Sequence, residues 1–181
     1  MQHAYGFEID DSIASVARLN GEFSAMNTHP IILALDASST SIGYCVYGGG
    51  VIDSSEITLT GKDIAQRCRQ AHAALGLILE AHPEIDVIAI EAPVARFAKS
   101  VIPQARVSGA LFALAGLRDI NIIEISPTEA KRALTGKGNA DKHMMQSAAA
   151  AYDVTGEHAA DALGVALAAV PRVVVVAQVT T

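Results

Sequence analysis

The order of apolar runs along this chain constrains its fold more than any other feature. Residues 31–35 form a continuous apolar run, which is typical of a strand buried on both faces. Two further strands are expected at 42–47 and 51–59, and the glycines at 48–50 between them can adopt the positive φ angles of a tight hairpin. Three strands joined by such short connections predict an antiparallel meander.

Helical and strand patterns alternate after this meander. Strands are expected at 86–91 and 120–125, and helices at 62–82, 101–117, 127–134, 141–152 and 157–170, the last ended by Pro171. Alternation of strands and helices predicts parallel crossover connections, so the complete sheet would be mixed. We therefore expect an α/β fold in which a mixed five-stranded sheet is flanked by helices.

Length and hydropathy favour one domain. The chain has 181 residues, of which 51% are hydrophobic, and this suffices for a single core. Residues 1–29 precede the first apolar strand and are expected to form an N-terminal leader outside the domain at 30–181. No run approaches the roughly 18 apolar residues of a membrane span, and no secretory signal opens the chain. We expect a cytoplasmic protein with no membrane partner.

The charge balance opposes a simple nucleic-acid binder. Thirteen Lys and Arg residues against nineteen Asp and Glu residues give a net charge of −6, whereas such proteins usually carry a basic excess. Local basic patches can still bind DNA, since affinity depends on the charges near the phosphates. A metal site built from carboxylates would also add negative charge that bound cations offset.

Two carboxylates follow apolar runs at the ends of expected strands. Asp36 ends the first strand and Glu91 the fourth. Ligand sites gather at strand ends in α/β sheets. Either residue alone could be a solvated strand-terminal acid, but two acids ending two neighbouring strands favour a shared site.

A histidine and an aspartate begin the last helix. His158 and Asp161 stand three residues apart and so share one helix face. Acids in a first turn also stabilise the helix dipole, which could account for Asp161 but not for His158. Together with Asp36 and Glu91 they make a set of three carboxylates and one imidazole. Such a set suits Mg²⁺ or Mn²⁺, and two ions about 4 Å apart would serve phosphodiester hydrolysis.

Five segments in order resemble the motifs of the RuvC family of Holliday junction resolvases. The resemblance extends from about residue 31 to residue 169. The segments are ILALDASSTSIGYCVY with Asp36, VIAIEAP with Glu91, PQARVSGAL with Gln104 and Arg106, AKRALTGKGNADK with Lys131 and Lys142, and EHAADALGVALAA with His158 and Asp161.

The resemblance implies a ribonuclease H-like fold and a metal-dependent endonuclease that nicks four-way junctions or related branched DNA. It implies that Asp36, Glu91, His158 and Asp161 are catalytic metal ligands for Mg²⁺, with Mn²⁺ as a substitute, although His158 could instead be a general acid or base. Gly43 would keep the hairpin backbone open to substrate. A homodimer is expected, with the helix at 101–117 as its interface. Expected DNA contacts come from Arg106, Lys131, Lys137, Lys142 and Phe97.

One segment departs from the family pattern. Where the family often has Gln, an apolar residue and Phe after the glutamate, this chain has Ala92-Pro93-Val94, and the nearest aromatic residue is Phe97.

Two alternative functions remain open from the sequence. The segment at 36–40 could serve as the phosphate loop of an ATP-binding protein of the sugar kinase, actin and Hsp70 group. A non-catalytic module that binds branched DNA would share the same fold.

Overall fold

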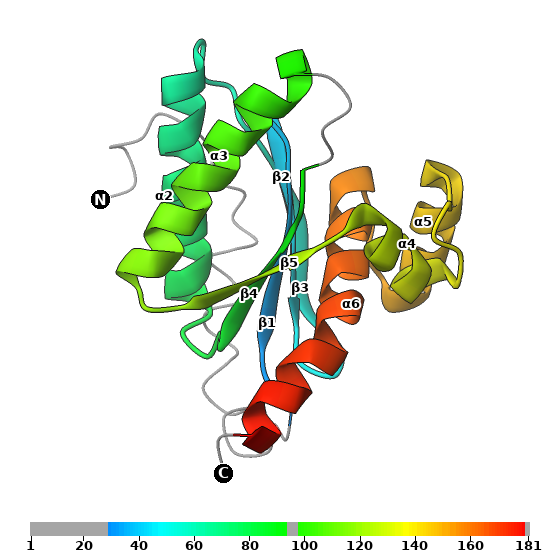
Figure 1. The fold of residues 1–181 in the computed structure, drawn as a ribbon. Helices are drawn as coiled ribbons and strands as arrows, with labels where there is room; N and C mark the ends of the chain where they lie inside the picture. The colour runs from blue at the N-terminus through cyan, green and yellow to red at the C-terminus, as the bar shows by residue number, and fades with distance from the viewer. Residues whose placement is uncertain (1–28, 94–97, 180–181) are drawn as a thin grey trace.

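The computed structural model describes residues 29–93 and 98–179, in which five strands form one mixed sheet with helices on both faces (Figure 1). Residues 1–28 of the expected leader at 1–29, and Phe97, lie outside the described residues. Across the sheet the order is β3 (Val51–Thr58), β2 (Ser41–Tyr47), β1 (Ile32–Ala37), β4 (Val87–Glu91) and β5 (Asn121–Ile125). The predicted α/β fold with a mixed five-stranded sheet is confirmed.

Strands joined by short connections pair antiparallel, whereas the two strands that follow helices pair parallel to their neighbours. β1, β2 and β3 are antiparallel neighbours, whereas β4 pairs with β1, and β5 with β4, in parallel. The parallel register pairs Leu35 with Ile90. Asp36 and Glu91 are the next residues on these two strands, so the sheet brings both carboxylates to one edge.

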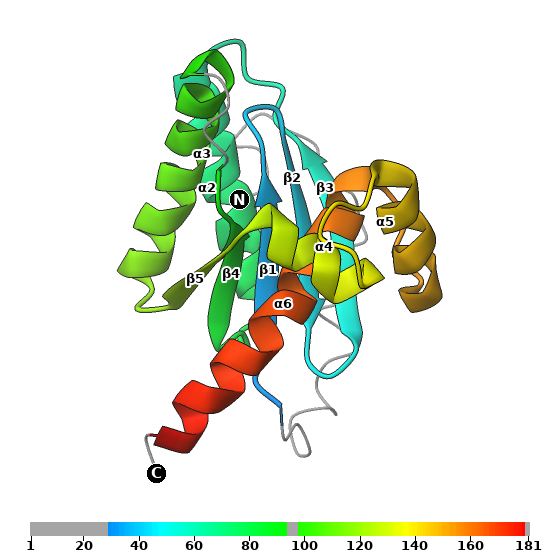
Figure 2. The ribbon, with the colours of Figure 1, turned by 45° about the vertical axis from the view of Figure 1, so that its right-hand side comes forward.

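Helices cover the two faces of the sheet. α2 (Ile64–Ala81) and α3 (Ala98–Leu117) lie on one face. The other face carries α6 (Glu157–Val179), on which α4 (Pro127–Thr135) packs, with α5 (Lys142–Ala149) and a 3₁₀ turn at Ala150–Tyr152 at its side. Figures 1 and 2 show the three layers, with α6 running past the sheet from the end of β1 toward the C-terminus.

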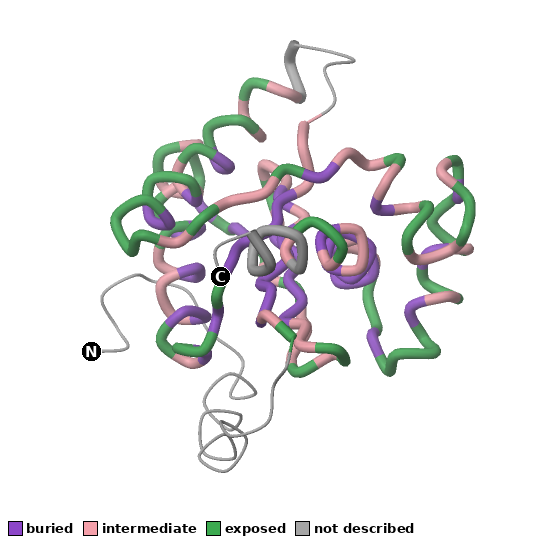
Figure 3. Tube along the Cα trace, turned by 60° about the horizontal axis from the view of Figure 1, so that its bottom comes forward, coloured by how far each residue is buried: buried purple, intermediate pink, exposed green. Residues whose placement is uncertain are grey.

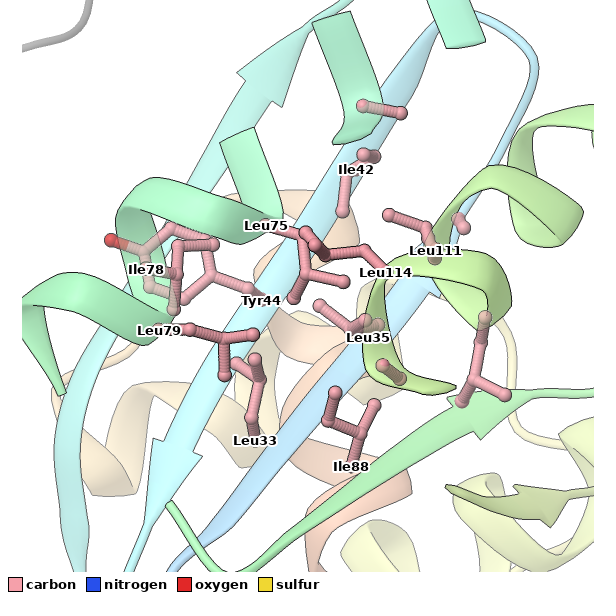
Figure 4. Close-up of a cluster of buried hydrophobic side chains, with 14 of the residues drawn as sticks. Leu33, Leu35, Ile42, Tyr44, Leu75, Ile78, Leu79, Ile88, Leu111 and Leu114 are labelled. Atoms are coloured by element: carbon pink, nitrogen blue, oxygen red, sulfur yellow. The ribbon is translucent and has the colours of Figure 1, made fainter. Parts of the chain in front are cut away.

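Large aliphatic side chains fill the layer between the sheet and α2 and α3. Leu33 and Leu35 of β1 meet Leu75 and Ile78 of α2 and Leu111 of α3 (Figure 4). Each of these five side chains is at most 2% exposed. At about 25 cal/mol per Å² of apolar surface, this layer supplies a large share of the folding free energy. Figure 3 shows buried residues in the middle of the molecule and exposed residues on its outer turns.

Small residues let α6 approach the opposite face closely. Its buried residues include Ala159, Ala162 and Ala166, which present little side chain to the strands. A Cβ at Gly43 of β2 would lie 2.1 Å from the carbonyl oxygen of His158, so only glycine fits there. The expectation that Gly43 faces substrate is therefore wrong, because α6 packs directly on it.

Two prolines lie inside helices. We predicted that Pro171 ends the last helix, but α6 continues to Val179. A proline removes one backbone hydrogen bond and bends a helix without always ending it. Arg172 donates to the carbonyl of Glu124 and pairs with Glu129, and these contacts anchor α6 just beyond the proline. α3 likewise begins at Ala98, before Pro103, rather than at residue 101.

None of the helices in the described ranges is long and apolar enough to cross a membrane.

Candidate active site

The site begins at the adjacent ends of β1 and β4. Ala34 and Ala89 face α6, and side chains two residues apart on a strand share a face. Asp36 and Glu91 therefore also point to the α6 side. Neither carboxylate is fully buried, since each lies where its strand leaves the core.

The first turn of α6 packs on the sheet and brings His158 to the site. Glu56 of β3 accepts hydrogen bonds through Oε1 from the backbone nitrogens of His158 (2.6 Å) and Ala159 (3.3 Å). A helix start leaves such N–H groups without internal partners, and a carboxylate there also complements the helix dipole. Gly156 precedes the helix at a φ of 96°, with its α-carbon close to the Glu56 carboxylate. Glu56 and Gly156 thus fix where His158 enters the site.

The His158 ring joins this turn to β1 and β2. Its Nδ1 lies 2.6 Å from Oδ2 of Asp36, and its Nε2 lies 2.9 Å from Oγ of Ser41. A carboxylate can only accept, so Nδ1 donates to Asp36. This hydrogen bond raises the pKa of His158 above its usual value, although partial burial opposes the shift.

The remaining two carboxylates resist ionisation. Burial, followed by repulsion from Asp36 and Asp161, raises the pKa of Glu91 to about 8. Burial, with repulsion from Asp36 and Glu157, raises the pKa of Asp161 to about 6. These mutual effects indicate that Asp36, Glu91 and Asp161 share one region of low polarity. The three carboxyl groups therefore do not ionise together readily without a further cation beside them.

The basic residues of the predicted DNA surface lie at different distances from these carboxylates. Lys131 of α4 is close enough to favour the ionised forms of Glu91 and Asp161. Lys142 pairs with Glu157 at the start of α6. Lys137 is exposed in the loop after α4, and Arg106 is exposed on α3. The structure thus brings Lys131 and Lys142 to the site, whereas Lys137 and Arg106 belong to surrounding surfaces.

Three further residues support the site. Ser41 and Glu56 contact His158, and Gln104 of α3 donates through Nε2 to the carbonyl oxygen of Ala37 (3.0 Å). The family motif included Gln104, but the sequence interpretation missed Ser41 and Glu56. A lone acid in a half-exposed strand carries no signal of its own. Ser41 directly follows the segment at 36–40 that suggested a phosphate loop.

The donor set fits divalent cations. Three carboxylates and an imidazole are ligands that Mg²⁺ and especially Mn²⁺ accept. The raised pKa values of Glu91 and Asp161 come from burial and mutual repulsion, which a bound cation would offset. Among the described residues, however, no three His, Cys, Asp or Glu side chains already stand arranged to hold an ion. Asp36 and His158 are hydrogen-bonded to each other instead. Ion binding would therefore replace that hydrogen bond.

Comparisons with known proteins agree with this geometry. The sequence profile of the family described as "Crossover junction endodeoxyribonuclease RuvC" matches residues 32–169. The protein of that name from Salinibacter ruber is 33% identical over 149 residues, which cover 76% of this chain and 83% of the relative. The one from Chlorobium phaeobacteroides is 31% identical over 159 residues, or 79% of this chain and 82% of the relative.

Solved structures share the fold. The structure of Thermus thermophilus RuvC in complex with Holliday junction substrate superposes with a TM-score of 0.66 at 21% identity and covers 77% of this chain and 92% of that chain. A second Thermus thermophilus RuvC structure gives a TM-score of 0.64 at 20% identity. The five-stranded sheet is thus a ribonuclease H-like sheet of the RuvC type. The matched profile spans all four predicted site residues, and the chain belongs to the crossover junction endodeoxyribonuclease RuvC family.

Proposed function

We propose that this protein nicks four-way DNA junctions by metal-dependent phosphodiester hydrolysis in the cytoplasm, with Asp36, Glu91, His158 and Asp161 as its catalytic residues. Endonucleolytic cleavage at DNA crossovers is the activity of the family. The observation that carries the assignment of residues is the cluster of three carboxylates whose charges oppose one another. Family membership favours this activity over the ATP-binding and purely DNA-binding alternatives.

The charges of the cluster explain how it would act. Two divalent cations, Mg²⁺ or Mn²⁺, would activate a water molecule and stabilise the leaving 3′ oxygen. Asp36, Glu91 and Asp161 would hold these ions through their carboxylate oxygens, with His158 as the fourth ligand. Lys131 stands beside the carboxylates, where it would favour their ionised forms and contact the substrate phosphate.

The surrounding cations would position the DNA. Lys142, Lys137 and Arg106 are exposed, and we propose that they contact phosphates. Phe97 would contact unstacked bases near the junction centre. A net charge of −6 makes such local contacts necessary. Binding would weaken steeply with salt for the same reason.

A nicking assay tests the activity. The full chain should nick a synthetic four-way junction in Mg²⁺ or Mn²⁺, and chelation by EDTA should stop the reaction. Linear duplex and flap substrates serve as controls and should be cut far more slowly. Junction binding without nicking in either metal would favour the non-catalytic alternative. ATP binding without junction binding would favour the kinase-like alternative.

We also propose that the protein acts as a homodimer through the outer face of α3. A four-way junction has near two-fold symmetry, and two symmetric nicks call for an isologous pair of subunits. This face leaves Ile102 51%, Phe112 38% and Leu117 79% exposed. Space beside Gly109 and Gly116 is open, since an added Cβ would meet no atom within 4 Å. A shallow pocket lined by Ala105, Gly109 and Phe112 continues this face and could receive a partner side chain.

The open space at Gly109 gives a sharp test of this interface. Gly109→Arg should leave the monomer folded, because arginine favours a helix over glycine and its Cβ would meet no atom within 4 Å there. In a dimer the same side chain would collide with the partner. Sedimentation at micromolar concentration should therefore give a dimer for the wild type and a monomer for Gly109→Arg, with Gly109→Ala as the control. A monomeric wild type, with junction present, would contradict the proposal.

A further inference from the structure

His158 is held at three points, and one of them is a hydroxyl outside the expected ligand set. Glu56 accepts from its backbone nitrogen, Asp36 accepts from Nδ1, and Ser41 contacts Nε2 at 2.9 Å. Ser41 lies at the start of β2, 117 residues earlier in the chain. The hydroxyl therefore belongs to β2, whereas the ring that it contacts belongs to α6.

The orientation of the ring decides which nitrogen faces the carboxylates. Nδ1 lies beside Asp36, whereas Nε2 points to Ser41. A cation shared between His158 and Asp36 would therefore be reached from Nδ1, which must then carry no proton. In a neutral ring the single proton would sit on Nε2. That proton needs an acceptor, and Oγ of Ser41 is within hydrogen-bonding distance.

A serine hydroxyl can satisfy Nε2 in both protonation states of that nitrogen. When Nε2 carries no proton, the Ser41 hydroxyl can donate to it; when Nε2 carries one, the Ser41 oxygen can accept it. Ser38 supports Ser41, and the two hydroxyl oxygens lie 2.8 Å apart. Oγ of Ser38 accepts from the backbone nitrogens of Thr40 (3.1 Å) and Ser41 (2.9 Å) and reaches the Ser41 carbonyl oxygen (3.0 Å). The Ser38–Ser41 turn is thus a rigid support for one side of the ring.

We propose that Ser41 is a positioning residue, whose hydroxyl selects the ring orientation and tautomer in which His158 presents Nδ1 to a divalent cation. This inference rests on the proposed metal-dependent function. An aliphatic side chain at 41 would leave Nε2 without this partner, and the half-exposed ring could turn over. Hydrogen-bond partners of metal-ligating histidines typically contribute about 10–100-fold to metal affinity.

Metal affinity measured without DNA tests the role of Ser41 independently of nicking. Calorimetric titration of Mn²⁺ should give about tenfold or weaker binding for Ser41→Ala than for the wild type. Ser41→Thr keeps the hydroxyl and should restore the affinity. Ser39→Ala is the matched control in the same turn, because the contact of Ser39 with Arg67 uses its backbone carbonyl oxygen. Its Mn²⁺ affinity should equal that of the wild type.

Nitrogen-15 NMR of the histidine rings provides a second readout that a merely structural role would not change. With saturating Mg²⁺, wild-type His158 should show one neutral tautomer with its proton on Nε2, and Ser41→Ala should show a mixture. Unchanged Mn²⁺ affinity in Ser41→Ala, or equal losses in Ser41→Ala and Ser41→Thr, would overturn the role of Ser41. Asp36→Asn separates the two hypotheses. If it binds Mn²⁺ as the wild type does, the metal site itself is wrongly assigned, and the inference about Ser41 falls with it.

Discussion

Two clusters of polar side chains in this molecule each place a histidine among acids, and they balance their charges differently. The active-site cluster is the proposed site of Asp36, Glu91, His158 and Asp161. The buried cluster, named after its histidine, comprises Tyr44, Asp53, His82 and Glu84; His82 is only 1% exposed, whereas the Glu84 side chain is 36% exposed. There, Nε2 and Nδ1 of His82 each lie 3.2 Å from a carboxylate, of Asp53 and Glu84 respectively, and Tyr44 donates to Asp53 at 2.9 Å.

The two clusters shift the pKa values of their acids in opposite directions. Burial alone would raise the pKa of Asp53, but the hydrogen bonds that it accepts from His82 and Tyr44 lower it. Burial alone would lower the pKa of His82, but its hydrogen bonds to Asp53 and Glu84 raise it. In the active-site cluster the pKa of Glu91 rises to about 8. In the buried cluster, hydrogen bonds thus favour the charged forms of Asp53 and His82, which stabilises the fold. In the active-site cluster, burial and repulsion disfavour the ionised forms of Glu91 and Asp161, and a bound external cation would favour them.

The largest effect that would sharpen this comparison is the loss of nicking when a carboxylate is removed from the active-site cluster. Asp36→Asn, Glu91→Gln and Asp161→Asn should each lower the nicking rate about a thousandfold or more, because a bound cation contributes several kcal/mol to the transition state. Junction affinity should persist, since phosphate contacts remain. Nicking and gel-shift assays on the same variants measure both properties. Near-wild-type nicking by any variant would remove that residue from the site.

Replacing Glu91 should not destabilise the protein without metal. Glu91→Gln removes a carboxyl group whose ionisation is already unfavourable, so the free energy of unfolding should stay the same or rise, most clearly above pH 8. Denaturant unfolding in EDTA measures it. A stability loss comparable with that expected for the buried cluster would show that both clusters are structural.

A matched substitution in the buried cluster should lower the stability of the protein and leave nicking intact. Asp53→Asn keeps the shape of the side chain but removes the charge that pairs with His82. Hydrogen bonds to charged groups contribute roughly 1.5–3 kcal/mol, so the free energy of unfolding should fall by about that amount. Nicking at 25 °C should remain near wild type. A nicking loss without a stability loss would contradict the separation of the two clusters.

A smaller effect should appear in the pH dependence of stability. The pKa of His82 is raised in the folded state, so its contribution is complete below its unfolded value of about 6.5 and is lost as the pH rises through the folded value. The pKa of Asp53 is lowered, so its contribution is lost as the pH falls through the folded value. The cluster should therefore stabilise the protein most between about pH 4 and pH 6.5.

The difference between wild type and His82→Gln isolates this contribution from that of Glu91. The stability difference between the two proteins, measured by denaturant unfolding in EDTA, should be largest near pH 6 and should decrease at higher pH. A difference that stays constant from pH 6 to pH 9 would mean that folding does not raise the pKa of His82.

The sequence alone indicated those residues of the candidate site that belong to a recognisable strand or helix pattern. Asp36 and Glu91 follow buried apolar runs, and His158 and Asp161 share a helix face, so strand and helix periodicity sufficed to select them. Ser41 and Glu56 depend on where α6 lies against β2 and β3, 117 and 102 residues away from His158. No local pattern encodes such contacts. The continuation of α6 past Pro171 depends likewise on the contacts of Arg172 with β5 and α4.

The smallest effect is expected from removing residues 1–25, which precede both clusters. The first core strand begins at Ile32 and the first site residue is Asp36. The deletion keeps His29, which lies beside Gly49 in the β2–β3 turn. Residues 1–25 contribute no motif residue. Thermal unfolding and junction nicking of the truncated chain should match those of the full chain. A lowered unfolding temperature with intact nicking would make the segment part of the core, whereas lost nicking with an unchanged unfolding temperature would make it part of the DNA-binding surface.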